Sequence, residues 1–210
     1  MIRAVIFDLD GVIVDTEPIW FETYGKVCRE YGFDFNQELD KLVKGRADGV
    51  VRLTATLGIP EKCGEFSEKV GRLYRELFDR KAKLMPGVLK LLRNLGKSYQ
   101  LGLATSAYKD RLEFNFQKFP QIKRFFVATV SADEVKNGKP SPDTFLLVAK
   151  KLNLEPEECL VIEDAETGVT AAKAARMKVI GVEPSRVTPQ NLSAADMVVN
   201  SLSEIRSKLL

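Results

Sequence analysis

The chain has no histidine among its 210 residues and only three cysteines. Without histidine it cannot form a Ser-His-Asp triad, a Cys-His pair or a His-ligated zinc site. Cys28, Cys63 and Cys159 are odd in number and widely spaced, which excludes a CxxC zinc site and argues against a disulfide framework. Acid–base chemistry must therefore fall to Asp, Glu, Lys, Tyr or Cys.

Long apolar runs and a strong charge of one sign are also missing. No run approaches the roughly 18 residues that a membrane span needs, and Asp8 comes too early for a secretory signal. The net charge is only +3, and residues 15–81 carry 12 Lys and Arg against 13 Asp and Glu. We therefore expect a cytoplasmic protein that binds neither membrane nor nucleic acid, and we expect a monomer.

Short apolar runs alternate with helical patterns over most of the chain. A continuous run such as Ala4–Phe7 is typical of a strand buried on both faces of a parallel sheet. The expected strands are 4–7, 101–104, 159–162 and 179–182, with weaker ones at 126–130 and 197–199. The expected helices between or after them are 86–96, 108–118, 142–152, 166–176 and 201–209. This alternation predicts an α/β fold, a doubly wound Rossmann-like parallel sheet.

Residues 15–81 interrupt the alternation. Helical segments are expected at 17–31, 36–44, 47–57 and 63–81, and no strand pattern lies among them. We predict an inserted all-helical cap at 15–81 and a catalytic core formed by 1–14 and 82–210. Trp20, in the first insert helix, could pack between the cap helices or face the cleft.

Polar side chains follow four of the expected strands. Ligands bind at the carboxyl edge of an open parallel sheet, so these side chains should converge there. They are Asp8, Asp10 and Gly11 after the first strand, Thr105 and Ser106 after the second, Lys139 beyond the third, and Glu163 and Asp164 after the fourth.

Each of these groups has a use in phosphoryl transfer. A carboxylate such as Asp8 can attack phosphorus, and Asp10, two residues on, would share its face in extended backbone and could serve as acid and base. Oxygens of Asp8, Asp10 and Asp164 suit Mg²⁺. Thr105 can donate to a phosphoryl oxygen and Lys139 can neutralise it. Gly11 permits an unusual backbone turn just past the nucleophile.

Taken singly, the same residues have structural explanations. Thr105 and Ser106 could cap the following helix, and Glu163 and Asp164 could cap the helix that starts near 166. Lys139 could be a surface lysine. The coincidence of all four groups, each after its own apolar run, favours a catalytic site.

The motifs resemble those of the haloacid dehalogenase superfamily of phosphotransferases, and the helical insert resembles the small cap of its β-phosphoglucomutase-like subfamily. The resemblance implies Asp8 as nucleophile and Asp10 as acid/base. It implies Mg²⁺, replaceable by Mn²⁺ or Co²⁺, on Asp8, the Asp10 carbonyl and Asp164, with Glu163 at or just outside the metal. Thr105 and Lys139, with Ser106 beside them, would clamp the phosphate. The stretches that carry the resemblance are Asp8–Val12, Leu103–Ser106, Gly138–Asp143 and Ile162–Asp164.

The resemblance places a specificity loop at Lys44-Gly45-Arg46 of the insert. Lys44 or Arg46 would bind sugar hydroxyls or a second phosphate, unless both are solvated charges of a helix turn. Mutases of the subfamily carry Gly-Val-Ser-Arg here, whereas this chain reads Gly-Arg-Ala-Asp, with Asp48 where a second phosphate would be repelled. We expect a Mg²⁺-dependent phosphatase acting on small phosphorylated sugars through an aspartyl-phosphate. The alternatives are a β-phosphoglucomutase, which interconverts β-glucose 1-phosphate and glucose 6-phosphate, and a non-catalytic binding module.

Overall fold

A computed structural model describes residues 1–183 and 187–205. A six-stranded sheet with the order β3-β2-β1-β4-β5-β6 lies at its centre, and all neighbouring strands are parallel. The strands are β1 (Ala4–Phe7), β2 (Gln100–Ala104), β3 (Ala128–Val130), β4 (Cys159–Glu163), β5 (Lys178–Val182) and β6 (Met197–Val199). The chain runs outward from β1 in both directions, which confirms the predicted doubly wound sheet.

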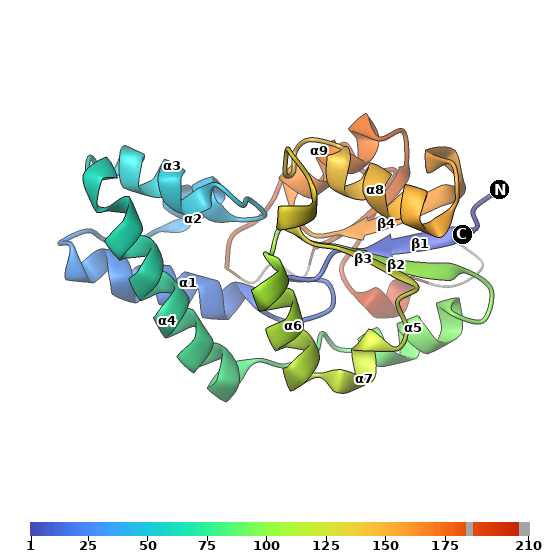
Figure 1. The fold of residues 1–210 in the computed structure, drawn as a ribbon, viewed down its shortest axis with the longest axis horizontal. Helices are drawn as coiled ribbons and strands as arrows, with labels where there is room; N and C mark the ends of the chain where they lie inside the picture. The colour runs from blue at the N-terminus through green and yellow to red at the C-terminus, as the bar shows by residue number, and fades with distance from the viewer. Residues whose placement is uncertain (184–186, 206–210) are drawn as a thin grey trace.

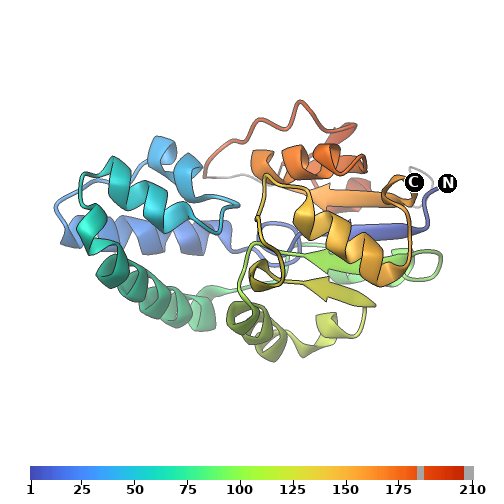
Figure 2. The same ribbon diagram turned by 45° about the horizontal axis from the view of Figure 1, so that its top comes forward.

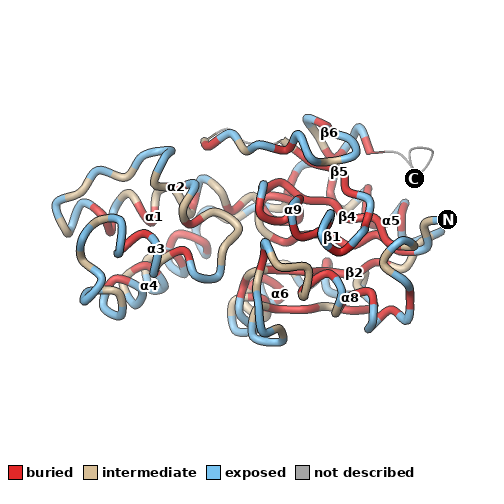
Figure 3. Tube along the Cα trace, turned by 90° about the horizontal axis from the view of Figure 1, so that it is seen from above, coloured by how far each residue is buried: buried red, intermediate tan, exposed pale blue. Residues whose placement is uncertain are grey.

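Strand β1 shows why this sheet is covered on both faces. Val5 and Phe7 belong to one hydrophobic cluster, and Ala4 and Ile6 belong to another. Since successive side chains of a strand point to opposite faces, each cluster lies on its own side of the sheet. An uninterrupted apolar run is therefore what this position requires (Figure 3).

Helices from different parts of the chain complete the two layers (Figure 1). Leu92 of α5 and Phe116 of α6 pack into the cluster of Val5 and Phe7, while Phe145 of α8 and Val169 of α9 pack into the other. The helices of this part are α5 (Val88–Leu95), α6 (Lys109–Lys118), α7 (Pro120–Lys123), α8 (Asp143–Leu152) and α9 (Glu166–Ala174), with 3₁₀ turns at Ala132–Glu134, Pro156–Glu158 and Leu202–Glu204.

One predicted helix is wrong where the structure describes it. We expected 201–209 to be helical, but only the 3₁₀ turn Leu202–Glu204 forms. Ser201 accepts a hydrogen bond from the backbone N–H of Ser203 and so ends the preceding extended segment, and a short turn then satisfies the local backbone groups. Residues 206–209 of the expected helix lie outside the described part.

The insert is helical, as the sequence predicts, and extends away from the carboxyl edge of the sheet (Figures 1 and 2). It contains α1 (Glu17–Glu30), α2 (Gln37–Val43), α3 (Gly49–Thr56), the 3₁₀ turn Pro60–Lys62 and α4 (Cys63–Lys81). Buried side chains from all four helices, including Val27, Val43, Leu53 and Phe66, form a separate hydrophobic cluster. The boundaries of the cap at 15 and 81 stay a prediction.

None of the described helices combines the length and the apolar character that crossing a membrane requires.

Candidate active site

Asp8, Lys139 and Glu163 form a buried cluster at the carboxyl edge of the sheet. Asp8 directly follows β1, Glu163 ends β4, and Lys139 comes from the loop before α8. Lys139 Nζ lies 2.5 Å from Asp8 Oδ1 and 2.6 Å from Glu163 Oε1, and it also donates to the carbonyl of Ala104. Asp8, Lys139 and Glu163 are 6%, 4% and 1% exposed, so Lys139 is not a surface lysine.

The charge of this cluster is not balanced. Burial raises the pKa of Asp8 well above its usual range, Lys139 opposes the shift, and the carboxylates of Glu163, Asp164 and Asp10 add to it. Burial alone would lower the pKa of Lys139, but Asp8 and Glu163 outweigh it and the net shift is upward, so the lysine stays charged. More anionic oxygen is gathered here than the lysine can neutralise.

Both carboxylate oxygens of Glu163 accept hydrogen bonds from other groups of the protein. Oε1 accepts from Lys139, and Oε2 accepts the backbone N–H groups of Asp164 and Ala165, each at 2.8 Å. These contacts lie in the short connection between β4 and α9. The predicted role of Glu163 at or beside a metal stays a prediction, whereas its hold on Lys139 is a direct contact.

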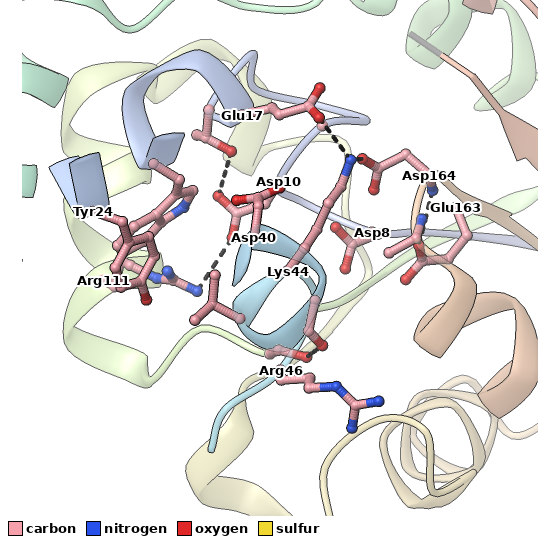
Figure 4. A pocket seen from close by; sticks show the side chains of 17 residues that line it. Asp8, Asp10, Glu17, Tyr24, Asp40, Lys44, Arg46, Arg111, Glu163 and Asp164 are labelled. Atoms are coloured by element: carbon pink, nitrogen blue, oxygen red, sulfur yellow. Dashed lines mark hydrogen bonds and ion pairs between the residues drawn. The ribbon is translucent and has the colours of Figure 1, made fainter. Parts of the chain in front are cut away.

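Asp10 is held from two sides. Thr16 Oγ1 donates to Asp10 Oδ1 at 2.8 Å, and Arg111 Nη2 lies 3.2 Å from Asp10 Oδ2. Thr16 belongs to the connection into the insert, and Arg111 lies in the first turn of α6. The Asp10 side chain therefore points into the space between sheet and insert (Figure 4).

Asp164 forms an ion pair with a lysine of the insert. Lys44 Nζ lies 3.4 Å from Asp164 Oδ2 and 3.0 Å from Glu17 Oε1. Burial raises the pKa of Asp164 to about 7, with Lys44 opposing the shift. Gly11, at φ +80°, passes so close that a Cβ there would lie 2.2 Å from Asp164 Oδ2, which explains the glycine after the first motif.

Thr105 and Ser106 contribute differently. Thr105 Oγ1 accepts the backbone N–H of Ala107 at 3.0 Å, so its hydroxyl hydrogen remains to be donated. Ser106 Oγ donates to the carbonyl of Gly45 at 3.0 Å and thereby joins the sheet edge to the insert. Gly45 has φ +69°, and a Cβ there would lie 2.5 Å from Thr167 Oγ1, so the close approach requires glycine.

These groups surround a small chamber of about 90 Å³. Asp8, Asp10, Ser106, Glu163 and Asp164 line it from the core. Lys44, Gly45 and Arg46 line it from the insert, where the sequence places them. Thr105 and Lys139 are not among its lining residues, but Lys139 contacts Asp8 and Glu163, which are.

A second cleft of about 530 Å³ adjoins the chamber between the insert and α6. Arg46, Ser106 and Arg111 line both spaces. Trp20 also lines both, and its ring stacks on Tyr74 of α4 at 3.8 Å. The sequence left open whether Trp20 packs between the cap helices or faces the cleft. Its side chain does both, because it stacks on Tyr74 and also lines the cleft.

Several polar residues that line the chamber were not among the predicted site residues. They include Thr16, Glu17, Asp40 and Arg111. Thr16 and Glu17 lie at the predicted start of the insert. Their place at the junction of core and insert could have marked them as residues near the site. Arg111 lies in the first turn of α6, soon after the Thr105-Ser106 pair, but no motif marks it.

A divalent cation would need backbone oxygen as well as carboxylate. Within residues 1–183 and 187–205, no three His, Cys, Asp or Glu side chains are grouped so that they could hold an ion. Asp8 and Asp164 both offer carboxylate oxygens to the chamber, and the Asp10 carbonyl lies two residues after Asp8 in the chain. This hard oxygen set, with its excess of negative charge, is of the kind that Mg²⁺ prefers, so the residues fit the ion.

Comparison with known proteins agrees with this arrangement. The family model of haloacid dehalogenase-like hydrolases matches residues 5–182. A phosphorylated carbohydrates phosphatase of Thermotoga maritima is 36% identical over 82% of this chain and 81% of that protein, and a β-phosphoglucomutase of Bacillus subtilis is 31% identical over 99% and 93%. A crystal structure of β-phosphoglucomutase from Clostridium difficile superposes with a TM-score of 0.85 at 29% identity, covering 100% of this chain and 95% of that one. The chain belongs to the haloacid dehalogenase-like hydrolases.

Proposed function

We propose that this protein is a Mg²⁺-dependent phosphatase of small phosphorylated sugars and that its reaction passes through a phosphorylated Asp8. One observation carries the proposal. A lysine held between two buried carboxylates, 2.5 Å from Asp8, contacts two residues that line the chamber, and a second cleft adjoins that chamber. Such a lysine can neutralise a phosphoryl group that approaches Asp8.

The proposed metal ligands are the carboxylates of Asp8 and Asp164 and the backbone carbonyl of Asp10. When bound, Mg²⁺, or Mn²⁺ or Co²⁺ in its place, supplies the positive charge that lets a carboxylate approach a phosphate. The raised pKa values of Asp8 and Asp164 support this assignment, because burial disfavours their ionised forms and a bound cation would stabilise those forms. Glu163 would act beside the metal by holding Lys139.

In the first step, an Asp8 oxygen bonds to phosphorus and the bond from phosphorus to the sugar oxygen breaks. Asp10 gives its proton to that oxygen, so the sugar leaves as a neutral alcohol. In the second step, Asp10 takes a proton from water, the water oxygen bonds to phosphorus, and the bond to Asp8 breaks. Inorganic phosphate leaves and the Asp8 carboxylate is restored.

The phosphoryl oxygens would be gripped by Lys139 and by the free hydroxyl hydrogen of Thr105. Ser106 instead holds Gly45 of the insert over the site. Lys44 and Arg46 would face the sugar. The printed activity of the Thermotoga maritima relative, a phosphatase of phosphorylated carbohydrates, supports this substrate class.

β-Phosphoglucomutase is the second candidate, supported by the name of the Bacillus subtilis relative. Asp48, which argues against a second phosphate, is paired with Arg52 at 2.7 Å, so its charge is partly compensated. Arg46 lines both the chamber and the cleft and could hold that phosphate. Monomeric state and cytoplasmic location stay predictions.

One assay separates the candidates. The protein is given β-glucose 1-phosphate and a panel of sugar phosphates, with Mg²⁺ or with a chelator, and both inorganic phosphate and glucose 6-phosphate are measured. A phosphatase releases phosphate from several substrates only with Mg²⁺. A mutase forms glucose 6-phosphate, is stimulated by a bisphosphate and releases little phosphate. Absence of both activities would favour the binding module.

A further inference from the structure

Arg111 connects the proposed acid/base to the insert. Its guanidinium reaches from the first turn of α6 to Asp10, with Nη2 3.2 Å from Oδ2. The other oxygen of Asp10 accepts from Thr16 at 2.8 Å. Each carboxylate oxygen therefore has its own partner, a hydroxyl donor at Oδ1 and a guanidinium cation at Oδ2, and together the two contacts restrict the direction in which the side chain points.

The same guanidinium lies against two aromatic rings of the insert. Its central carbon is 5.0 Å from the ring centre of Trp20 in α1 and 6.0 Å from that of Tyr74 in α4. The two rings stack on each other at 3.8 Å, and Tyr74 is buried. A planar cation over an aromatic face is favourable, more so where water is largely excluded.

We propose that Arg111 is a positioning residue, which aims the Asp10 carboxylate at the leaving oxygen and is itself held by the Trp20–Tyr74 stack of the insert. The inference rests on the proposed function for the role of Asp10. Its consequence is that the placement of the acid/base depends on the insert being docked, because two of the contacts that hold Arg111 come from α1 and α4.

The contacts explain why arginine stands here. Its flat guanidinium can donate to a carboxylate at one edge while its face lies on a ring, and it keeps its charge at any working pH. A lysine could supply the charge but not the flat contact. A misplacement of about 1 Å at a reacting group can cost on the order of 100-fold in rate, so weak anchoring of Asp10 would be visible in kcat.

The test uses full-length Arg111→Met and Arg111→Lys proteins, assayed on the best substrate of the wild type. Arg111→Met keeps much of the volume and loses the charge, so kcat should fall about 100-fold while KM changes less than about threefold. Arg111→Lys should recover part of the loss. Lys118→Met is the matched control, since Lys118 is an exposed cation of the same helix that donates to the carbonyl of Asp79 in α4 away from the cleft.

A double-mutant cycle distinguishes positioning from general support of the fold. In an Asp10→Asn background, Arg111→Met should reduce kcat far less than it does alone, because the group to be positioned has changed. Trp20→Leu should also lower kcat and should add little to Arg111→Met. Independent effects of Arg111 and Asp10, or a wild-type kcat in Arg111→Met, would overturn the proposal.

Urea unfolding of the same four proteins of the cycle provides a readout that needs no activity. A measurable coupling between Asp10 and Arg111 in the unfolding midpoints supports the contact, and additive midpoints overturn it. If the wild type turns over no substrate, the proposed function fails, and the unfolding cycle then decides alone whether Arg111 holds Asp10.

Discussion

The carboxyl edge of the sheet and the helical insert contribute different kinds of side chain to one chamber. Asp8, Lys139 and Glu163 of the core are buried and bonded to one another. Lys44 and Arg46 of the insert are only partly buried, and Arg46 also borders the larger cleft. The core therefore carries a preorganised set of charges, and the insert adds Lys44, which is paired with Glu17 and Asp164, and Arg46, which borders the open cleft.

This difference suggests a division of labour between chemistry and selection. Groups that lie in fixed positions stabilise charge that develops during reaction, since they need no reorganisation at that moment. Groups at the border of an open cleft can instead contact the rest of the substrate. The substitutions below test this division, in order of decreasing effect.

The largest effect is expected from Asp8→Asn. The amide cannot form the phosphorylated carboxylate, so turnover should fall by about 10⁴-fold or more on every substrate. Phosphate release under saturating Mg²⁺ is the measurement, with Asp79→Asn, an exposed aspartate of α4, as control. Retained turnover would remove Asp8 as the nucleophile and would contradict the assignment of the chemistry to the core.

Lys139→Met should come next. It deletes the cation between Asp8 and Glu163 and leaves two buried carboxylates without their partner. We expect kcat to fall by about 10²- to 10³-fold on all substrates alike, as for loss of one electrostatic group in an active site. Lys136→Met, which changes an exposed lysine of the same loop, is the control. A loss confined to some substrates would assign Lys139 to selection instead.

Leu53→Ala tests whether the insert has a core of its own. Leu53 is fully buried in the cluster formed by α1–α4, so its truncation should cost about 2–5 kcal/mol of stability. Urea unfolding should show the loss, whereas Val51→Ala, at a position 59% exposed on the same helix, should show little. A first transition confined to the insert would support the boundaries at 15 and 81, and one shared transition would argue against them.

The smallest effect is expected from Arg46→Met. Loss of one charged hydrogen bond to the substrate should raise KM about 10-fold with little change in kcat. Kinetics on a sugar phosphate and on a small aryl phosphate would show whether the change depends on the sugar. Arg80→Met, which removes an exposed cation of α4 paired with Glu76, is the control. A fall in kcat without a change in KM would place Arg46 in the chemistry.

The predicted strands and most helices of the core are confirmed, because their patterns reflect local requirements. A strand such as β1 must be apolar at every position when both faces are covered. The predicted helix at 201–209 was wrong because a local hydrogen bond of one side chain competes with the helical pattern. Residues 201–205 have a helix-like composition, but Ser201 bonds to a neighbouring backbone N–H and only a 3₁₀ turn follows.

The amino-acid sequence by itself determined the alternation of strands and helices, the position of the insert and the acidic, hydroxyl and lysine motifs after the strands. These follow from periodicity and from residue type, which are local properties. Only the tertiary structure decided that Lys139 lies between Asp8 and Glu163, that Lys44 meets Asp164, and that Arg111 joins Asp10 to Trp20. Such contacts depend on which side chains long-range packing brings together, and no local pattern encodes that.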